Sequence, residues 1–529
     1  MRRRAFLRLA AGAAAAGAWF PSSAVGRPRP RRGGVLKVIG LEPLTFDPHG
    51  GSVLQTQLVS SFVRRTLFKF ASGAGRGPSD FTLVPDLALA AEVSRDGRVY
   101  TFALRRGVRW ESRAPLKGRE LVAADVKWSF ERAIRKAAPG LLGQVEGIET
   151  PDAHTVRITL ADACAPFLQS LAEPSSCIVP PEVEDRHGDL KAAESMLGCG
   201  PFVLERYEPG VKAVFARNPD YYANGLPYLD RVEWLFVRDR ATQLSLFRAG
   251  QVDLPSHDAR IPRVEAAAFK KSNPAYPMVV WDGLGVRTLA FRTDKAPFSD
   301  ARIRQAFSLA VDRTRWLAQY LDGAGWEDSG PVPAPMREWK LPAAALGGGT
   351  RWLQHDPGLA RRMLAEAGFA NGMKVKCATW PWHGPENLEE LELLSGGLRQ
   401  IGVELQIVND EQGNYERGRF DDLAWGPSPL FTEVDGYLYN FFRSGAPGNR
   451  SRVADIFLDG MLDAQRRYTS RSSRKTVIDD IQRHAAERVY YLYAPCPKSV
   501  SCWTPRIRNY GCKNSFDRGA QLEVVWLQP

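Results

Sequence analysis

The stretch GCGPFVLERYEPGVKAVFARNPDYY, Gly198–Tyr222, begins like a glycine-rich phosphate-binding loop and then continues differently. A phosphate loop passes directly into a helix whose first N–H groups hold the anion, but here Pro201 is followed by strand-forming residues. The segments 201–207 and 211–217 predict two strands, and Glu208-Pro209-Gly210 supplies the turn between them. We interpret the stretch as a structural hairpin, so the function has to be sought elsewhere in the chain.

The composition describes a globular protein with more than one core. The chain has 529 residues, of which 44% are hydrophobic and 25% charged, and this length predicts two or three domains. Its net charge of +12 comes from basic residues that are mostly interspersed with acidic ones, which argues against a nucleic-acid surface.

Seven cysteines occur, without a Cys-x-x-Cys pair and without histidines at metal-ligand spacing beside them, so a zinc site is not expected. In an oxidising compartment some of them should pair. Cys164 with Cys177 is the local pair to test first.

The first 24 residues, MRRRAFLRLAAGAAAAGAWFPSSA, combine paired arginines, a short apolar segment and a small-residue pattern typical of a cleavage site. This pattern predicts a twin-arginine export signal cleaved after Ala24, and therefore a periplasmic protein. A basic arm on a cytoplasmic protein is the weaker alternative. No later run reaches the roughly 20 apolar residues that a membrane span needs.

Strands and helices alternate along the rest of the chain, which predicts an α/β fold with mixed sheets. The segments 373–380, 387–402 and 403–409 follow one another as strand, helix and strand, as in a βαβ unit. Other helices are expected over 122–134 and 240–250, from Ser299 or Asp300 onward, and over 356–368.

Four blocks of the sequence carry a family likeness. They are LVPDLALAAEVSRDGRVYTFALRRGVRW, the hairpin stretch, FRTDKAPFSDARIRQAFSLAVDR and DPGLARRMLAEAGF. In order and spacing they resemble the family 5 extracellular solute-binding proteins of ABC importers, the peptide/nickel type.

The resemblance implies a periplasmic-binding-protein-like fold, with two lobes joined by a two-segment hinge and an extra subdomain in the first lobe. It further implies that the lobes close on a solute. The expected parts are a signal peptide at 1–24, lobe I at 33–75, 200–286 and 494–529, its subdomain at 76–199, and lobe II at 287–493.

The same resemblance implies a monomeric receptor without catalytic residues, metal or cofactor. Its partners would be a small organic solute, peptide-like or anionic, and the ABC permease and ATPase subunits at the inner membrane. The sequence has no Gly-x-Ser-x-Gly, His-Glu-x-x-His or Gly-Lys-Ser/Thr phosphate-loop motif, and its histidines are scattered. A sensory binding protein and a secreted hydrolase are the alternatives.

Aromatic residues beside Pro or Gly at strand ends are candidate walls of the binding site, with core packing as the alternative: Trp380, Trp382 and Trp425. Dipeptide-binding relatives hold the two ends of their ligand with an aspartate and an arginine, where this chain places Ser428 and Gly384. A free dipeptide would lack both counter-charges, so it is not the expected ligand.

The charged candidates complete the predicted site. Arg292 and Arg443 are expected to receive an anionic or carboxylate-bearing solute, and Asp435 to be the polar centre of an Asp-Gly-aromatic block. For that block, a helix-capping aspartate with solvated arginines is the alternative. The remaining predicted contacts are Phe46 and His49, beside a structural Asp47, and His383.

Overall fold

The computed structural model describes residues 29–50, 54–136, 144–326, 330–380, 385–411, 414–415 and 417–528. They form two compact units: unit 1, Met1–Val280 with Val500–Pro529, and unit 2, Trp281–Ser499. The predicted signal peptide lies outside the described residues. The lobe boundaries expected at residues 287 and 493 stay a prediction.

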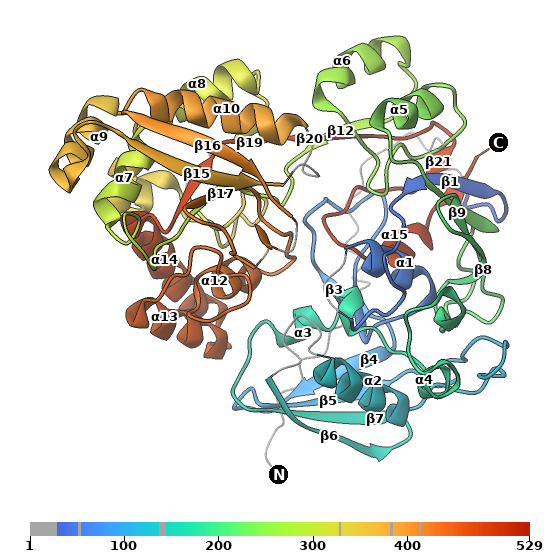
Figure 1. The fold of residues 1–529 in the computed structure, drawn as a ribbon. Helices are drawn as coiled ribbons and strands as arrows, with labels where there is room; N and C mark the ends of the chain where they lie inside the picture. Colours follow the sequence, from blue (N-terminus) through green and yellow to red (C-terminus); the bar gives the residue numbers. More distant parts are fainter. Residues whose placement is uncertain are drawn as a thin grey trace, which may run out of the picture. The chain divides into compact units, whose positions relative to one another are not determined.

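Unit 1 contains the elements of both chain ends (Figure 1). They are β1 Val35–Gly40, α1 Leu54–Val63, β2 Phe68–Phe70, β3 Leu83–Pro85, β4 Ala88–Val93, β5 Val99–Leu104, α2 Ala123–Arg135, β6 Val145–Asp152, β7 Thr155–Leu160, α3 Phe167–Ser170, α4 Pro181–His187, β8 Phe202–Glu208, β9 Lys212–Arg217, β10 Arg231–Phe236, α5 Arg240–Arg248, β11 Arg260–Ile261, α6 Arg263–Ser272, β12 Met278–Trp281, β20 Ser499–Cys502, β21 Ile507–Arg508, α15 Arg518–Leu522 and β22 Trp526–Leu527.

Two four-stranded sheets organise unit 1. The first has the order β1-β10-β9-β8, in which β8 and β9 pair antiparallel, so the predicted hairpin is confirmed. The second has the order β4-β5-β7-β6 and carries α2 on one face (Figure 1). Helix α2 places Val126 and Phe130, one turn apart, against this sheet, and both are fully buried.

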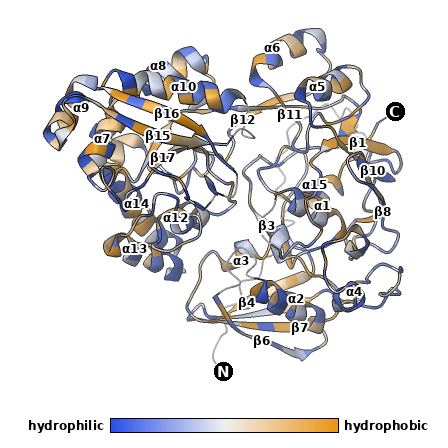
Figure 2. Ribbon diagram, viewed as in Figure 1, coloured by the Kyte–Doolittle hydropathy of each residue, from blue (hydrophilic) through white to orange (hydrophobic). Residues whose placement is uncertain are grey.

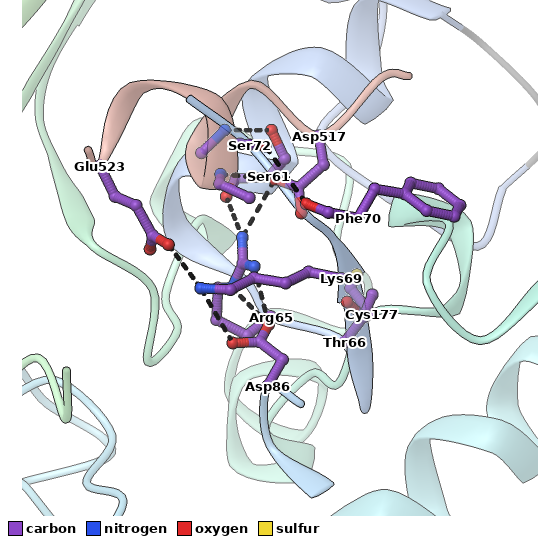
Figure 3. A network of polar contacts seen from close by, with 12 residues as sticks. Ser61, Arg65, Thr66, Lys69, Phe70, Ser72, Asp86, Cys177, Asp517 and Glu523 are labelled. Atoms are coloured by element: carbon purple, nitrogen blue, oxygen red, sulfur yellow. Dashed lines mark hydrogen bonds and ion pairs between the residues drawn. The ribbon is translucent and has the colours of Figure 1, made fainter. Parts of the chain in front are cut away.

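A buried ionic network ties the C-terminal segment to the residues that follow α1, the first helix of unit 1 (Figure 3). Arg65 contacts Asp86 at 2.7 Å and Asp517 at 3.0 Å, and Lys69 bridges Asp86 and Glu523. Beside it, Gly519 packs so closely on α1 that an added Cβ would lie 1.9 Å from the Ser61 carbonyl oxygen. Residues 500–529 are therefore an integral part of unit 1.

The chain leaves unit 1 at the end of β12 and returns at the start of β20. These two strands are neighbours in a three-stranded sheet with the order β11-β20-β12. The two connections between the units thus start from adjacent strands.

Unit 2 is built on one five-stranded sheet with the order β16-β15-β17-β13-β18. Its elements are β13 Arg287–Phe291, α7 Ala301–Leu309, α8 Arg313–Arg315, β14 Gly325–Trp326, α9 Pro357–Leu364, β15 Met373–Thr379, α10 Pro385–Arg399, β16 Val403–Asn409, β17 Leu423–Pro427, α12 Val434–Phe442, α13 Ile456–Arg467, α14 Arg471–Arg488, β18 Tyr491–Ala494 and β19 Cys496–Pro497.

Helix α10 connects two parallel strands of this sheet, β15 and β16, so the predicted βαβ unit is confirmed. Asp300 caps α7 by accepting from the N–H of Arg302. Figure 2 shows hydrophobic residues concentrated in the strands of the sheet, while the surrounding helices alternate between hydrophilic and hydrophobic positions. This pattern places the core of unit 2 between the sheet and its helices.

All seven cysteines are buried and none forms a disulfide, so the expected Cys164–Cys177 disulfide is not formed. Burial raises the pKa of the Cys177 thiol to about 11, which keeps it protonated. Within the described ranges, no helix is both long and apolar enough to cross a bilayer, and no group of three His, Cys, Asp or Glu residues could hold a metal ion.

Candidate functional site

Strand direction defines the edge of unit 2 where a ligand is best placed. Strand β15 runs parallel to both β16 and β17, whereas β13 runs antiparallel to β17. The carboxyl ends of β15, β16 and β17, at Thr379, Asn409 and Pro427, therefore share one edge with Arg287, the first residue of β13. We call it the carboxyl edge. In open α/β sheets, ligands bind outside the carboxyl ends of the strands.

Two predicted site residues lie at the carboxyl edge. Trp380 directly follows β15 and is half-buried, and Ser428 directly follows β17. Ser428 is held by Val286, whose carbonyl accepts its N–H at 2.8 Å and whose N–H donates to its hydroxyl at 3.2 Å. Trp382, His383 and Gly384, in the loop after Trp380, lie outside the described residues.

Trp425 is a core residue, and the expectation that it walls the site is wrong. Its side chain has no solvent exposure, and its ring centroid lies 6.2 Å from that of Trp316 inside the core of unit 2. The indole Nε1 donates to the Asn387 carbonyl at 3.1 Å. Because β17 is covered on both faces, the tryptophan packs inward although its strand ends at the carboxyl edge.

Arg292 lies at the opposite end of the sheet from Trp380 and Ser428. It follows Phe291, the last residue of β13, which pairs with Leu423 at the start of the antiparallel β17. Its guanidinium is also occupied, because it binds Asp294 at 2.7 and 2.8 Å and the Phe420 carbonyl at 2.7 Å. The structure therefore does not group Arg292 with the predicted aromatic walls.

Asp435 and Arg443 are both neutralised inside unit 2. Asp435 is 4% exposed and accepts from Arg466 at 2.6 and 2.8 Å, while Glu433 caps helix α12 in its place. Arg443, at the end of α12, binds Asp459 at 2.9 Å and Asp463 at 3.1 Å. These pairs join α12 to α13, so neither residue offers an uncompensated charge to a solute.

Phe46 and His49 are interior residues of unit 1, which corrects their expected position on a rim. Phe46 is 5% exposed and makes an edge-to-face contact with Tyr207, with the ring centroids 5.1 Å apart. His49 is fully buried, with Nδ1 3.2 Å from Arg132 and Nε2 3.1 Å from the Cys177 carbonyl. Arginine always donates, so Nδ1 accepts and Nε2–H donates.

Burial and the charge of Arg132 lower the pKa of His49 to about 3, so its ring stays neutral. The adjacent Asp47 binds Arg132 with both carboxylate oxygens at 2.8 Å. The predicted structural role of Asp47 is therefore confirmed.

Four charged or polar residues outside the predicted site meet at the carboxyl edge around Pro427. We call them the Pro427 cluster: Arg287, Glu390, Tyr415 and Arg450. Arg287 pairs in register with Pro427 across β13 and β17, and the Pro427 carbonyl lies 3.4 Å from the Tyr415 hydroxyl and 3.5 Å from Arg450 Nη1.

Among the described residues, one arginine of the cluster has a carboxylate partner and the other has none. Arg287 lies 2.6 Å from Glu390, which is 1% exposed. Burial raises the pKa of Glu390, and the charge of Arg287 opposes that rise. Arg450 is buried and stacks on Tyr415, with its guanidinium carbon 4.3 Å from the ring centroid.

A sequence signal existed for Arg287, a charged residue opening an otherwise apolar strand. None distinguished Arg450 from the other arginines that surround it in the sequence.

Comparison with known proteins identifies the family to which the chain is similar. Residues 82–449 match the model of the bacterial extracellular solute-binding proteins, family 5 Middle. The chain is 27% identical over 515 residues to "Di/tripeptide-binding protein 1" of Pseudomonas aeruginosa, covering 90% of this chain and 91% of that protein.

Two solved structures share the fold. The periplasmic binding protein DppA from Helicobacter pylori, in complex with the peptide STSA, has a TM-score of 0.80 at 22% identity, over 94% of this chain and 99% of that one. The binding protein AgaA from A. tumefaciens, in complex with agropinic acid, has a TM-score of 0.79 at 24% identity and the same coverage. The family match covers well over half of the sequence and the α/β fold agrees with it, so the chain belongs to the family 5 bacterial extracellular solute-binding proteins.

Proposed function

We propose that this protein is the periplasmic receptor of an ABC importer and captures a small organic solute, peptide-like or carboxylate-bearing, for a membrane permease. The observation that carries the proposal is the family match over residues 82–449 on a fold of two compact units that the chain connects twice. Relatives with the same fold hold a peptide or agropinic acid.

The proposed mechanism is binding without chemistry. The solute stabilises a closed state of the protein because it contacts both units, and the permease recognises that state. Export through a twin-arginine signal at residues 1–24 and action as a monomer belong to the same proposal. Ser428 supports a solute other than a free dipeptide, because its hydroxyl cannot neutralise an ammonium group.

Mass spectrometry of the natively purified protein tests the proposal most directly. The protein is isolated without refolding and then denatured, and the released compounds are compared with those from a heat-unfolded control. We expect one class of small organic solute in near-stoichiometric amount. The same compound, added back to refolded protein, should change tryptophan fluorescence saturably and be recovered unchanged. Turnover of the compound would contradict a receptor role, and recovery of an ordinary dipeptide would contradict the argument from Ser428.

A further inference from the structure

Three arginines near strand and helix ends of unit 2 have a carboxylate partner: Arg287 has Glu390, Arg292 has Asp294, and Arg443 has Asp459 and Asp463. Arg450 differs from them. In the part of the chain that the structure describes, no carboxylate lies within ion-pair distance of its guanidinium. Its contacts are the Pro427 carbonyl at 3.5 Å and the rings of Tyr415 and Phe441, 4.3 and 5.8 Å from its guanidinium carbon.

Arg450 has very little contact with solvent in the ligand-free structure. The residue is 4% exposed, and its Nε is buried without a hydrogen-bond partner among the described residues. Moving an unpaired cation into such a place costs several kcal/mol, of which stacking on aromatic rings returns about 1 to 2 kcal/mol. Burial raises the pKa of Tyr415, so the phenol stays neutral and supplies no counter-charge.

The guanidinium is held in place by its surroundings. Gly418 has φ +63° and lies so close that an added Cβ would be 2.8 Å from the Arg450 carbonyl oxygen and 2.9 Å from its Cα. Together with the Tyr415 ring on the guanidinium face, this contact fixes both the backbone and the head group of Arg450. A fixed donor loses little entropy when it binds an anion.

Arg450 also stands where a solute is expected. The carbonyl that it contacts belongs to the last residue of β17, at the carboxyl edge and next to Ser428. Since Glu390 already neutralises Arg287, the Pro427 cluster carries one positive charge in excess. One carboxylate matches this excess, whereas a phosphate dianion would leave a negative charge uncompensated.

We infer that Arg450 binds a carboxylate of the transported solute and makes the receptor selective for carboxylates. This inference rests on the proposed function and names the anion-binding residue for it. In this role Arg450 takes the place of the predicted Arg292 and Arg443. The charges of those two arginines are already neutralised by Asp294, Asp459 and Asp463.

The test compares matched acids and amides. Ligand-free protein, prepared by unfolding, dialysis and refolding, is mixed with a library of tripeptides made as free acids and with the same library made as C-terminal amides. Affinity selection with mass spectrometry identifies the retained pairs, and calorimetry gives their Kd values. Wild-type protein should bind the acids roughly tenfold to a hundredfold more tightly than the amides, as expected for a charge-assisted hydrogen bond.

Three variants locate the effect. Arg450→Met keeps the volume and the apolar stem, so it should reduce the affinity for acids to that for amides and leave the affinity for amides within about twofold. Arg450→Lys should keep a reduced preference. Arg443→Met, which removes a paired arginine on the neighbouring helix, is the matched control and should keep the full preference. Circular dichroism and thermal unfolding establish that each variant is folded. The comparison of acids with amides on wild-type protein tests the inference even if a variant does not fold.

The outcomes separate this inference from the proposed function. Equal binding of acids and amides by wild-type protein would leave the receptor intact and overturn the role of Arg450. An acid preference that survives in Arg450→Met would also overturn it. Binding of neither library would refute a peptide-like solute and, with it, a peptide carboxylate as the ligand of Arg450. An acid preference that Arg450→Met abolishes and Arg443→Met retains would establish it.

Discussion

At the scale of single residues, burial decides which polar and aromatic side chains are available to a ligand. Trp380 directly follows β15 and Trp425 lies within β17 of the same sheet, yet the first is half-buried and the second fully buried. The sequence predicts that both stand near strand ends. The sequence does not predict which face of the sheet is covered at each position, because the helices that cover it come from distant parts of the chain.

Replacing Trp425 by alanine should therefore test stability rather than binding. The substitution leaves a cavity beside Trp316 and removes the indole hydrogen bond to Asn387. We expect a loss of about 3 to 5 kcal/mol in the free energy of unfolding, measured by urea denaturation. Trp380→Ala, at a half-buried position, is the matched control and should cost clearly less. Equal costs would contradict the placement of Trp425 in the core.

His49 makes a second prediction, on the pH dependence of stability. Its pKa is about 3 in the folded protein and 6.5 in an ordinary environment. Below pH 6.5 the unfolded chain therefore binds a proton at His49 that the folded protein does not bind. The folded state should lose stability as the pH falls from 6.5 toward 3, by about 2 kcal/mol at pH 5 from this residue alone.

The measurement is urea unfolding at pH 7.5 and pH 5.0. His49→Gln, which cannot take up the proton, should show a smaller drop between the two pH values by about the same 2 kcal/mol. His187→Gln, at an exposed position of α4, should leave the wild-type drop unchanged. If His49→Gln kept the full drop, the buried, neutral state of His49 would be wrong.

At the scale of elements, the sequence predicted most of what local chemistry controls. The β8–β9 hairpin follows from its turn residues, α7 begins at its capping aspartate, and β15, α10 and β16 follow from their periodicity. The direction of β13 was not predictable in this way. Its antiparallel pairing with β17 is a long-range contact, and it puts Arg292 at the end of the sheet away from Trp380.

Close packing of α15 on α1 gives a prediction at this scale. Gly519→Ala would bring a methyl group against the Ser61 carbonyl, which belongs to the backbone and cannot rotate away. We expect a loss of about 1 to 3 kcal/mol or more in unfolding free energy. Gly460→Ala, on helix α13 with no heavy atom within 4 Å of the added Cβ, should be neutral or stabilise by about 0.5 to 1 kcal/mol. Thermal unfolding of both variants measures these changes. We expect a lower Tm for Gly519→Ala and an unchanged or higher Tm for Gly460→Ala, and a Gly519→Ala variant as stable as wild type would contradict the close packing of α15 on α1.

At the scale of the whole molecule, unit 1 is assembled from segments at both ends of the chain. Arg65 and Asp517 are 452 residues apart in the sequence and form a buried ion pair at 3.0 Å (Figure 3). The family resemblance implied that the C-terminal tail returns to the first lobe, but residue patterns alone could not pair these side chains. The Pro427 cluster is a similar case, since its members come from four separate segments of the chain, at residues 287, 390, 415 and 450.

Arg65→Met should therefore destabilise unit 1 selectively. The substitution leaves Asp86 and Asp517 buried with their main cation removed, which we expect to cost about 3 to 5 kcal/mol. Pulse proteolysis across a urea series, read by mass spectrometry, should show cleavage within residues 29–280 at lower urea than in wild type, while cleavage within residues 300–490 keeps its wild-type midpoint. Arg292→Met, which breaks a partly exposed pair in unit 2, is the matched control and should leave the unit 1 midpoint unchanged. A parallel shift of both units in Arg65→Met would mean that they unfold as one cooperative body, and the network would then stabilise the whole receptor.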